Sequence, residues 1–73
     1  MQRKNITGQQ IRKARKDAGI TQAKLAAELQ LLEIDIDRSA IAKIETDRRP
    51  VTDIEVAAIA KILKVPIERL FES

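Results

Sequence analysis

The sequence predicts an all-helical protein with a single domain, and three features support this prediction. Apolar residues recur three or four positions apart, which is the spacing that places side chains on one face of a helix. Aromatic residues make up only 1% of the chain, whereas β-sheets are enriched in them. Residues that cap helix N-termini stand before several apolar stretches. With 73 residues the chain can form one small core, so we expect one compact domain with a flexible arm at residues 1–6.

The spacing and the caps together predict five helices, near residues 8–18, 22–32, 38–46, 53–63 and 67–72. The expected N-caps of the first four are Thr7, Thr21, Asp37 and Thr52. Glu55 follows Thr52 at the spacing of a capping box, in which each side chain bonds the backbone amide of the other residue. Pro66 suits the start of the last helix, because the amide that it lacks would be unpaired there. Gly19 suits the end of the first helix, where a left-handed conformation is common.

The core expected from the helical spacing is aliphatic. Its predicted members are Ile11, Ala14, Ala18, Leu25, Ala26, Leu29, Leu32, Ile41, Ile44, Val56, Ile59, Ala60, Leu63 and Leu70. The chain has no cysteine for a disulfide and no histidine, which excludes the usual sets of zinc ligands. Helix packing or self-association must therefore supply the stability of this short chain.

The segment between the second and third helices alternates apolar and acidic residues in the manner of an edge strand, from Glu33 to Ile36. We interpret it instead as an enlarged turn, because helical spacing of leucines continues up to it. Ile36 is expected to pack on Ile41 across the N-terminus of the third helix. Ile34 is expected to lie beneath the second helix, which leaves Glu33 and Asp35 exposed.

Basic residues are concentrated in two stretches, one before Leu25 and one from Arg38 to Arg49, although the net charge is only +3. Such clusters predict a polyanionic partner. Charge alone is equally consistent with a surface that is merely solvated. The choice between these two interpretations depends on the motifs.

The composition disfavours catalysis, metal binding and membrane insertion. Without His, Cys or Tyr, the remaining general bases are carboxylates and lysines at caps or on solvent-facing positions, so we expect no enzyme. Glu33, Asp35 and Asp37 are spaced like the start of a calcium loop. However, Arg38 and Ile44 stand where that loop requires Gly and Glu. The apolar runs are too short to cross a bilayer and no signal peptide is evident, so we expect a cytoplasmic protein.

Three segments taken in order, ITQAKLAAEL, SAIAKIE and RRPVTDIEVAAIAKILKVPIERLF, resemble the helix-turn-helix domains of the Cro and lambda-repressor type, also called the XRE type. The resemblance extends from about Ile11 to Phe71. It implies a compact five-helix domain that binds operator DNA, commonly as a dimer, with the third helix in the major groove. Compared with that family, the turn before the third helix is longer and lacks glycine.

The third helix is expected to carry the residues that read bases, because its apolar positions face the core and its polar positions face outward. These candidate readers are Arg38, Ser39, Ala42 and Lys43. The guanidinium of Arg38 can form two parallel hydrogen bonds to a guanine, and Lys43 can reach a guanine or a phosphate. The candidate contacts to the DNA backbone are Thr21, Gln22, Arg12, Lys13, Arg48 and Arg49.

The resemblance also implies two further roles. It implies that Gln22 bonds the DNA backbone and braces the third helix, although an exposed residue in the first turn is an equally good reading. It implies that Arg15 and Glu45 form an ion pair between the first and third helices. We therefore assign Arg15 and Glu45 to the fold, because a half-buried charge requires a partner.

The sequence thus predicts sequence-specific binding of double-stranded DNA by a bacterial or phage regulator, most simply a repressor, with no metal, cofactor or small-molecule ligand. The alternative is a protein-interaction module on the same fold, antitoxin-like or anti-repressor-like, with little DNA binding of its own. The polar and basic outward face of the third helix favours DNA. A homodimer through Ile67, Leu70 and Phe71 is expected, unless these residues close the core of the monomer.

Overall fold

The computed structural model describes residues 6–71, and all regular structure in that range is helical. It comprises α1 (Ile6–Asp17), α2 (Gln22–Leu31), α3 (Arg38–Glu45), α4 (Asp53–Leu63) and the 3-10 helix η1 (Ile67–Phe71). The predicted all-helical class is confirmed. Four of the five predicted helices are α-helices within residues 6–71, and the fifth, predicted near residues 67–72, is a 3-10 helix. In η1 the amide of Arg69 donates to the carbonyl of Pro66 at 3.0 Å, which is the tighter 3-10 pattern.

The ends of the chain limit what can be compared with the sequence. Of the arm predicted at residues 1–6, residues 1–5 lie outside the described residues, and Ile6 already belongs to α1. Residue 72, the predicted end of the last helix, also lies outside them. Between residues 6 and 71, no helix has the length and apolar character that crossing a membrane requires.

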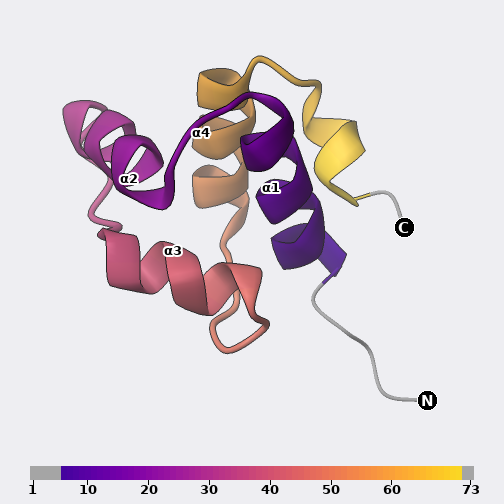
Figure 1. Cartoon of the computed structure of the whole chain (residues 1–73), viewed down its shortest axis with the longest axis horizontal. Helices are drawn as coiled ribbons and strands as arrows, with labels where there is room; N and C mark the ends of the chain where they lie inside the picture. Colours follow the sequence, from indigo (N-terminus) through magenta and orange to yellow (C-terminus); the bar gives the residue numbers. More distant parts are fainter. Residues whose placement is uncertain (1–5, 72–73) are drawn as a thin grey trace.

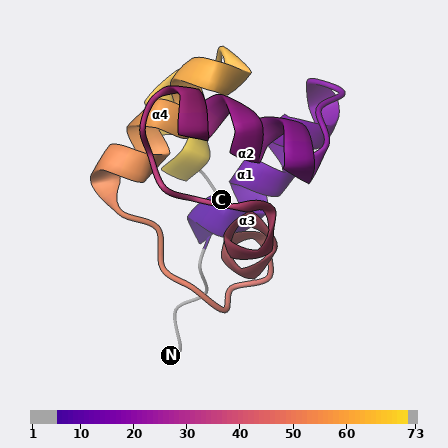
Figure 2. The ribbon, with the colours of Figure 1, turned by 90° about the vertical axis from the view of Figure 1, so that its left-hand side faces the viewer.

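The helices pack around one core, and α4 contacts α1, α2 and η1 (Figure 1). α1 packs against both η1 and α4, whereas α2 packs against α3 and α4. α3 also contacts α1, and it lies along one edge of the molecule. Seen almost end-on in Figure 2, α3 sits beneath α1 and α2, and the loop that leads from it to α4 runs along the same lower side. One long side of α3 is therefore free to meet a partner.

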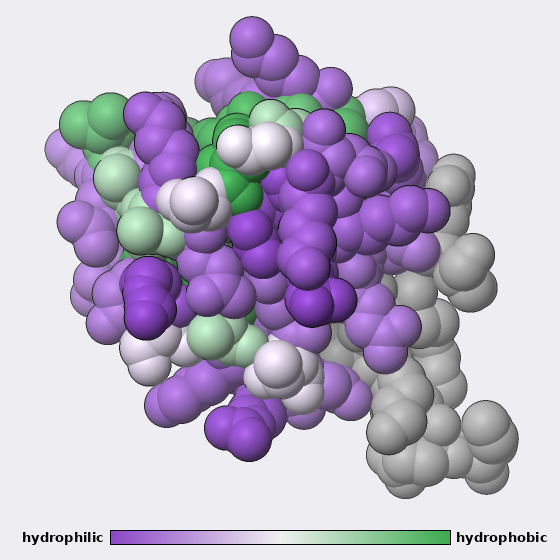
Figure 3. Space-filling model, in the orientation of Figure 1, coloured by the Kyte–Doolittle hydropathy of each residue, from purple (hydrophilic) through white to green (hydrophobic). Residues whose placement is uncertain are grey.

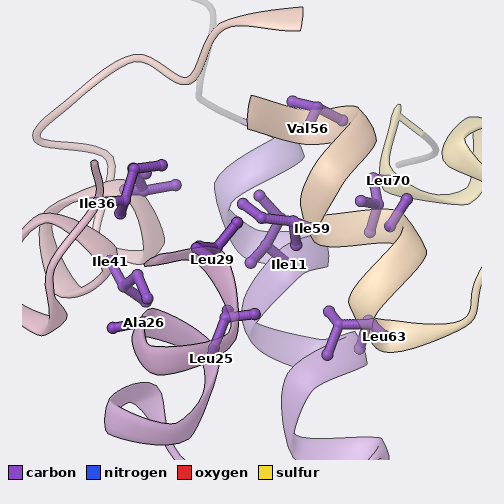
Figure 4. Packing of buried hydrophobic residues seen from close by; sticks show 13 residues of the cluster. Ile11, Leu25, Ala26, Leu29, Ile36, Ile41, Val56, Ile59, Leu63 and Leu70 are labelled. Carbon is purple, nitrogen blue, oxygen red and sulfur yellow. The ribbon is translucent and has the colours of Figure 1, made fainter. Parts of the chain in front are cut away.

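Side chains from every helix meet in one core, together with Ile36 from the connector between α2 and α3 (Figure 4). Ile36 is fully buried, as the staple to Ile41 predicted. Two predicted core residues, Ala18 and Leu32, are exposed, and Leu32 keeps 45% of its surface accessible. Both lie just beyond the last residue of a helix, where the chain has turned away from the face that the helical spacing describes.

The predicted N-caps agree with the structure except at the first helix. The side chains of Thr21, Asp37 and Thr52 each accept a hydrogen bond from the amide three residues further on. Thr52 and Glu55 form the predicted capping box. The predicted cap at Thr7 is wrong, because α1 begins at Ile6 and so places Thr7 inside its first turn.

Each α-helix within residues 6–71 ends in the same way. The first or second residue after the helix adopts a left-handed conformation, with φ of 72° at Gly19, 62° at Glu33, 64° at Asp47 and 60° at Lys64. Its amide bonds the carbonyl three residues earlier, and the next amide bonds the carbonyl five residues earlier. These two bonds define the Schellman motif. Only Gly19 could be recognised from the sequence, since the other three residues are not glycine.

The connector between α2 and α3 follows from this motif. Glu33 takes the left-handed position, and the amide of Ile34 then donates to the carbonyl of Leu29 at 3.0 Å. The turn directs Ile34 back against the core, while Glu33 and Asp35 remain exposed, as predicted. The alternating pattern therefore reflects a helix end followed by a cap and not a strand.

Gly19→Ala is expected to lower the free energy of unfolding by about 1 kcal/mol, because a left-handed conformation costs an L-residue that much. A Cβ at Gly19 would meet no atom within 4 Å, so no steric clash adds to this cost. The matched variant Glu33→Gly should have the opposite effect and raise the stability by about 0.5 kcal/mol, since glycine relieves the strain but loses more chain entropy. Urea denaturation followed by circular dichroism measures both stability changes. A shift in the same direction for the two variants would contradict the left-handed helix ends assigned to Gly19 and Glu33.

Candidate nucleic-acid interface

α3 separates its core residues from its outward residues. Ile41, Ile44 and Glu45 are buried against the rest of the domain. Arg38, Ser39 and Lys43 are exposed, and Ala42 is half-buried between them. Asp37 caps the helix by accepting from the amide of Ala40 at 2.8 Å, which holds the first turn in place. The structure thus brings all four predicted base readers onto one side of α3.

The first turn of α3 carries a shallow hollow, lined by Asp37, Arg38, Ser39 and Ala42. Lys43 lies about one turn further along the helix. The major groove of DNA is about 12 Å wide and admits an α-helix. A helix at the edge of the molecule, with polar groups along its free side, has the geometry for this groove (Figures 1 and 2).

Behind α3 lies a buried ion pair that joins it to α1. Arg15 donates from Nε to Oε2 of Glu45 at 2.7 Å and from a terminal nitrogen to Oε1 at 3.1 Å. Its other terminal nitrogen donates to the carbonyl of Ile20 at 2.7 Å. The side chains of Arg15 and Glu45 are only 9% and 1% exposed. The predicted pairing between the first and third helices is confirmed.

Gln22 adds α2 to this network. Its half-buried side chain donates from Nε2 to Oε1 of Glu45 at 3.1 Å, so the predicted bracing of α3 by Gln22 is confirmed. An amide nitrogen carries two hydrogens, so the same group can also serve an acceptor outside the protein. Thr21 is exposed beside it, and its hydroxyl accepts from the amide of Lys24 at 3.0 Å. The N-terminus of α2 is therefore fixed directly against the back of α3.

On α1, the predicted phosphate contacts point in different directions. Arg12 and Lys13 are both exposed. Successive residues turn by about 100° around a helix, so Arg12, three positions before Arg15, lies on the side of α1 that faces α3. Lys13 lies almost opposite that side. Lys16 is exposed four positions after Arg12 and shares its side, and this i, i+4 spacing was the signal that could have added Lys16 to the candidates.

The loop after α3 contains two arginines with different surroundings. Arg48 is exposed. Arg49 forms a two-pronged ion pair with Glu55, with nitrogen to oxygen distances of 3.1 and 3.0 Å. The hydrogen bond from Arg49 lowers the pKa of Glu55, and the same bond raises the pKa of Arg49. The structure therefore gives Arg49 an acidic partner inside the protein.

Hydrophilic and apolar residues occupy different parts of the surface (Figure 3). On the face shown, hydrophilic residues cover most of α1 and α3, while apolar residues gather towards the upper edge, near α2 and the upper part of α4. Glu33 and Asp35 line a separate hollow with Gln30 and Ile34. No group of acidic residues among residues 6–71 is arranged to hold a metal ion.

Comparisons with known proteins agree with this geometry. Residues 11–70 match the sequence model of a family described as helix-turn-helix. Among solved structures, the chain is similar to the restriction-modification controller protein C.AhdI from Aeromonas hydrophila. The two share 28% sequence identity over 89% of this chain and 87% of that one, with a TM-score of 0.78. No curated protein sequence matches the chain.

Arg15→Ala is expected to lower the free energy of unfolding by about 3 to 5 kcal/mol, because it leaves the buried carboxylate of Glu45 without its cation. Chemical denaturation provides the measurement. Lys24→Ala is the matched control, since it removes the cation of an exposed pair, Lys24 and Glu28, at 3.1 Å. That control should change the stability by less than about 1 kcal/mol. If both variants lost a similar amount of stability, burial of the Arg15–Glu45 pair would not increase its contribution to the free energy of unfolding.

Proposed function

We propose that this chain, which belongs to the Cro/C1-type (XRE) family of helix-turn-helix DNA-binding transcription regulators, reads operator DNA in the major groove with α3 and acts as a repressor. One observation carries this proposal. The outward side of α3 presents Arg38, Ser39 and Lys43 to solvent, while its inward side is held by the core and by the buried ion pair. A rigid helix with polar residues on its free side meets the requirements for reading base edges.

Each candidate reader has chemistry that suits a base edge. The guanidinium of Arg38 can donate two parallel hydrogen bonds to N7 and O6 of a guanine. Ser39 can donate or accept, and the methyl group of Ala42 can contact that of a thymine. Lys43, one turn further on, can donate to a guanine or to a phosphate. We assign sequence discrimination to these four residues.

Contacts to phosphates would set the position of α3 in the groove. The N-terminus of α2 supplies one such contact through Thr21 and the second amide hydrogen of Gln22, supported by the positive end of the helix dipole. Arg12 flanks α3 from α1, and Arg48 follows α3 in the next loop. Lys13 faces away from α3, so we assign it to long-range attraction of DNA.

The alternative, a protein-interaction module, requires an apolar side on the presented helix. Among residues 7–71, the most exposed large aliphatic residues are Leu31 and Ile54, at 77% and 75%, and they lie on α2 and α4. The outward side of α3 carries none. This distribution supports DNA as the partner of α3.

We also propose a homodimer that uses the C-terminal segment. Leu70 is fully buried and closes the core of the monomer, whereas Ile67 and Phe71 are 37% and 53% exposed. An interface at this segment would therefore rest on Ile67 and Phe71. A symmetric dimer would bind two inverted half-sites centred about 10 base pairs, or one turn of DNA, apart.

Selection of duplexes from a randomised pool, followed by gel shift, tests the function. The protein is expected to enrich one sequence, arranged as two inverted half-sites if the dimer forms, and to bind more tightly as salt is lowered. Enrichment of a single half-site would reject the dimer alone. Absence of binding to any duplex at low salt would reject the DNA-binding function, because phosphate contacts are strongest under that condition.

Arg38→Ala should weaken binding to the selected sequence by about 1 to 3 kcal/mol and relax the preference at one base pair. Arg12→Ala should weaken selected and random duplexes alike and reduce the salt dependence by about one unit of slope. Titrations of both variants at several salt concentrations separate the two roles. If both variants lose the same affinity on both kinds of DNA, α3 is not the reading helix.

A further inference from the structure

The loop from residue 46 to 52 joins α3 to α4, and the end nearer α3 is firmly held. Asp47 takes a left-handed conformation, with its amide bonded to the carbonyl of Ile44 at 3.2 Å. The amide of Arg48 donates to the carbonyl of Lys43 at 2.7 Å. The hydroxyl of Thr46 also donates to the carbonyl of Ala42 at 2.8 Å. These bonds hold the backbone of the loop to α3 as far as the amide of Arg48, and the residues after that amide depend on contacts at the other end of the loop.

The end nearer α4 is held by side chains. The carboxylate of Glu55 accepts both prongs of Arg49, and its Oε1 also accepts from the amide of Thr52 at 3.0 Å. A terminal nitrogen of Arg49 donates in addition to the carbonyl of Pro50 at 2.9 Å. One carboxylate on the first turn of α4 thus anchors both the arginine and the cap of that helix.

Burial distinguishes the two arginines of this loop. The side chain of Arg49 is 31% exposed and that of Glu55 only 14%, so their pair is partly shielded from water. Arg48 is exposed, and in Figure 2 the loop runs along the same lower side of the molecule as α3. A phosphate that sought Arg49 would have to compete with a carboxylate already bonded to it in two places. A phosphate that approached Arg48 would not have to compete with Glu55.

We propose that Arg49 is a positioning residue for DNA binding, which holds the loop against Glu55 so that Arg48 lies beside α3 and contacts a phosphate. This proposal rests on the DNA-binding function proposed above. It replaces a direct contact between Arg49 and DNA with an indirect role. The geometry of the ion pair supports the change, because the fork of an arginine matches a carboxylate in a way that a lysine cannot.

Two variants separate the indirect role from a direct contact. Arg49→Lys keeps the positive charge that a phosphate contact needs but loses the paired geometry with Glu55. Glu55→Ala frees Arg49 from its partner, and a direct contact would then become stronger. Positioning predicts that both variants bind a random duplex more weakly, by roughly threefold to tenfold, with a salt dependence reduced by about one unit of slope.

Two control variants accompany these measurements. Glu28→Ala makes the same change in net charge as Glu55→Ala, but at an exposed pair on α2. It should bind DNA as tightly as the unmodified protein, or more tightly. Thr52→Ala removes the cap hydroxyl of α4 and leaves the pair of Arg49 and Glu55 in place, so it reports the effect of weakening that helix alone. Thermal unfolding of each variant confirms that it is folded at the temperature of the titration.

A double variant tests the route through Arg48. If Arg49 acts by placing Arg48, then Arg49→Lys should cause no further loss of affinity in a protein that already carries Arg48→Ala. Additive losses would overturn the proposal, and so would a Glu55→Ala protein that binds as tightly as Glu28→Ala. An unmodified protein that binds no DNA would overturn both this role and the proposed function. Binding that is intact but indifferent to Arg49 would overturn only the role.

Discussion

The buried ion pair between Arg15 and Glu45 is the interaction on which the presentation of α3 depends. Aliphatic contacts are non-directional and allow a short helix to rotate by small angles with little cost. A buried carboxylate has no such freedom, because each of its bonds must be kept to offset the cost of removing it from water. Glu45 accepts from Arg15 on α1 and from Gln22 on α2, so its position fixes the rotation of α3. That rotation decides which side chains face outward.

The ends of α3 complete this control. Asp37 holds the first turn from one side, and the left-handed residue Asp47 ends the helix on the other. Between them the helix has 8 residues, which is too short to be stable alone in water. The surface of α3 is therefore a product of its neighbours. A change in α1 or α2 that disturbs the ion pair would alter which side chains of α3 face outward without touching an exposed residue of α3.

Much of the fold could be predicted from local patterns. The features that were missed depend on the path that the chain takes between the helices. Helical spacing identified the core, and caps such as Thr52 marked helix starts within a residue or two. The left-handed conformations of Glu33 and Lys64 carry no signal, because neither is glycine. The capping box predicted the role of Glu55 at the helix start. Nothing local indicated that its carboxylate also binds Arg49, since that contact depends on how the loop turns.

The candidate interface shows the same limit, because the positive charge available to DNA is smaller than the number of basic residues implies. Arg15 is neutralised inside the protein, and Arg49 is bonded to a partly shielded carboxylate. Arg38 and Arg48 have the same guanidinium but are exposed. Arginine side chains thus have three roles in this small domain: one fixes a helix, one holds a loop and others are exposed to solvent. Burial and the nearest carboxylate decide among them. The family resemblance indicated both for Arg15, whereas no pattern in the sequence indicated them for Arg49.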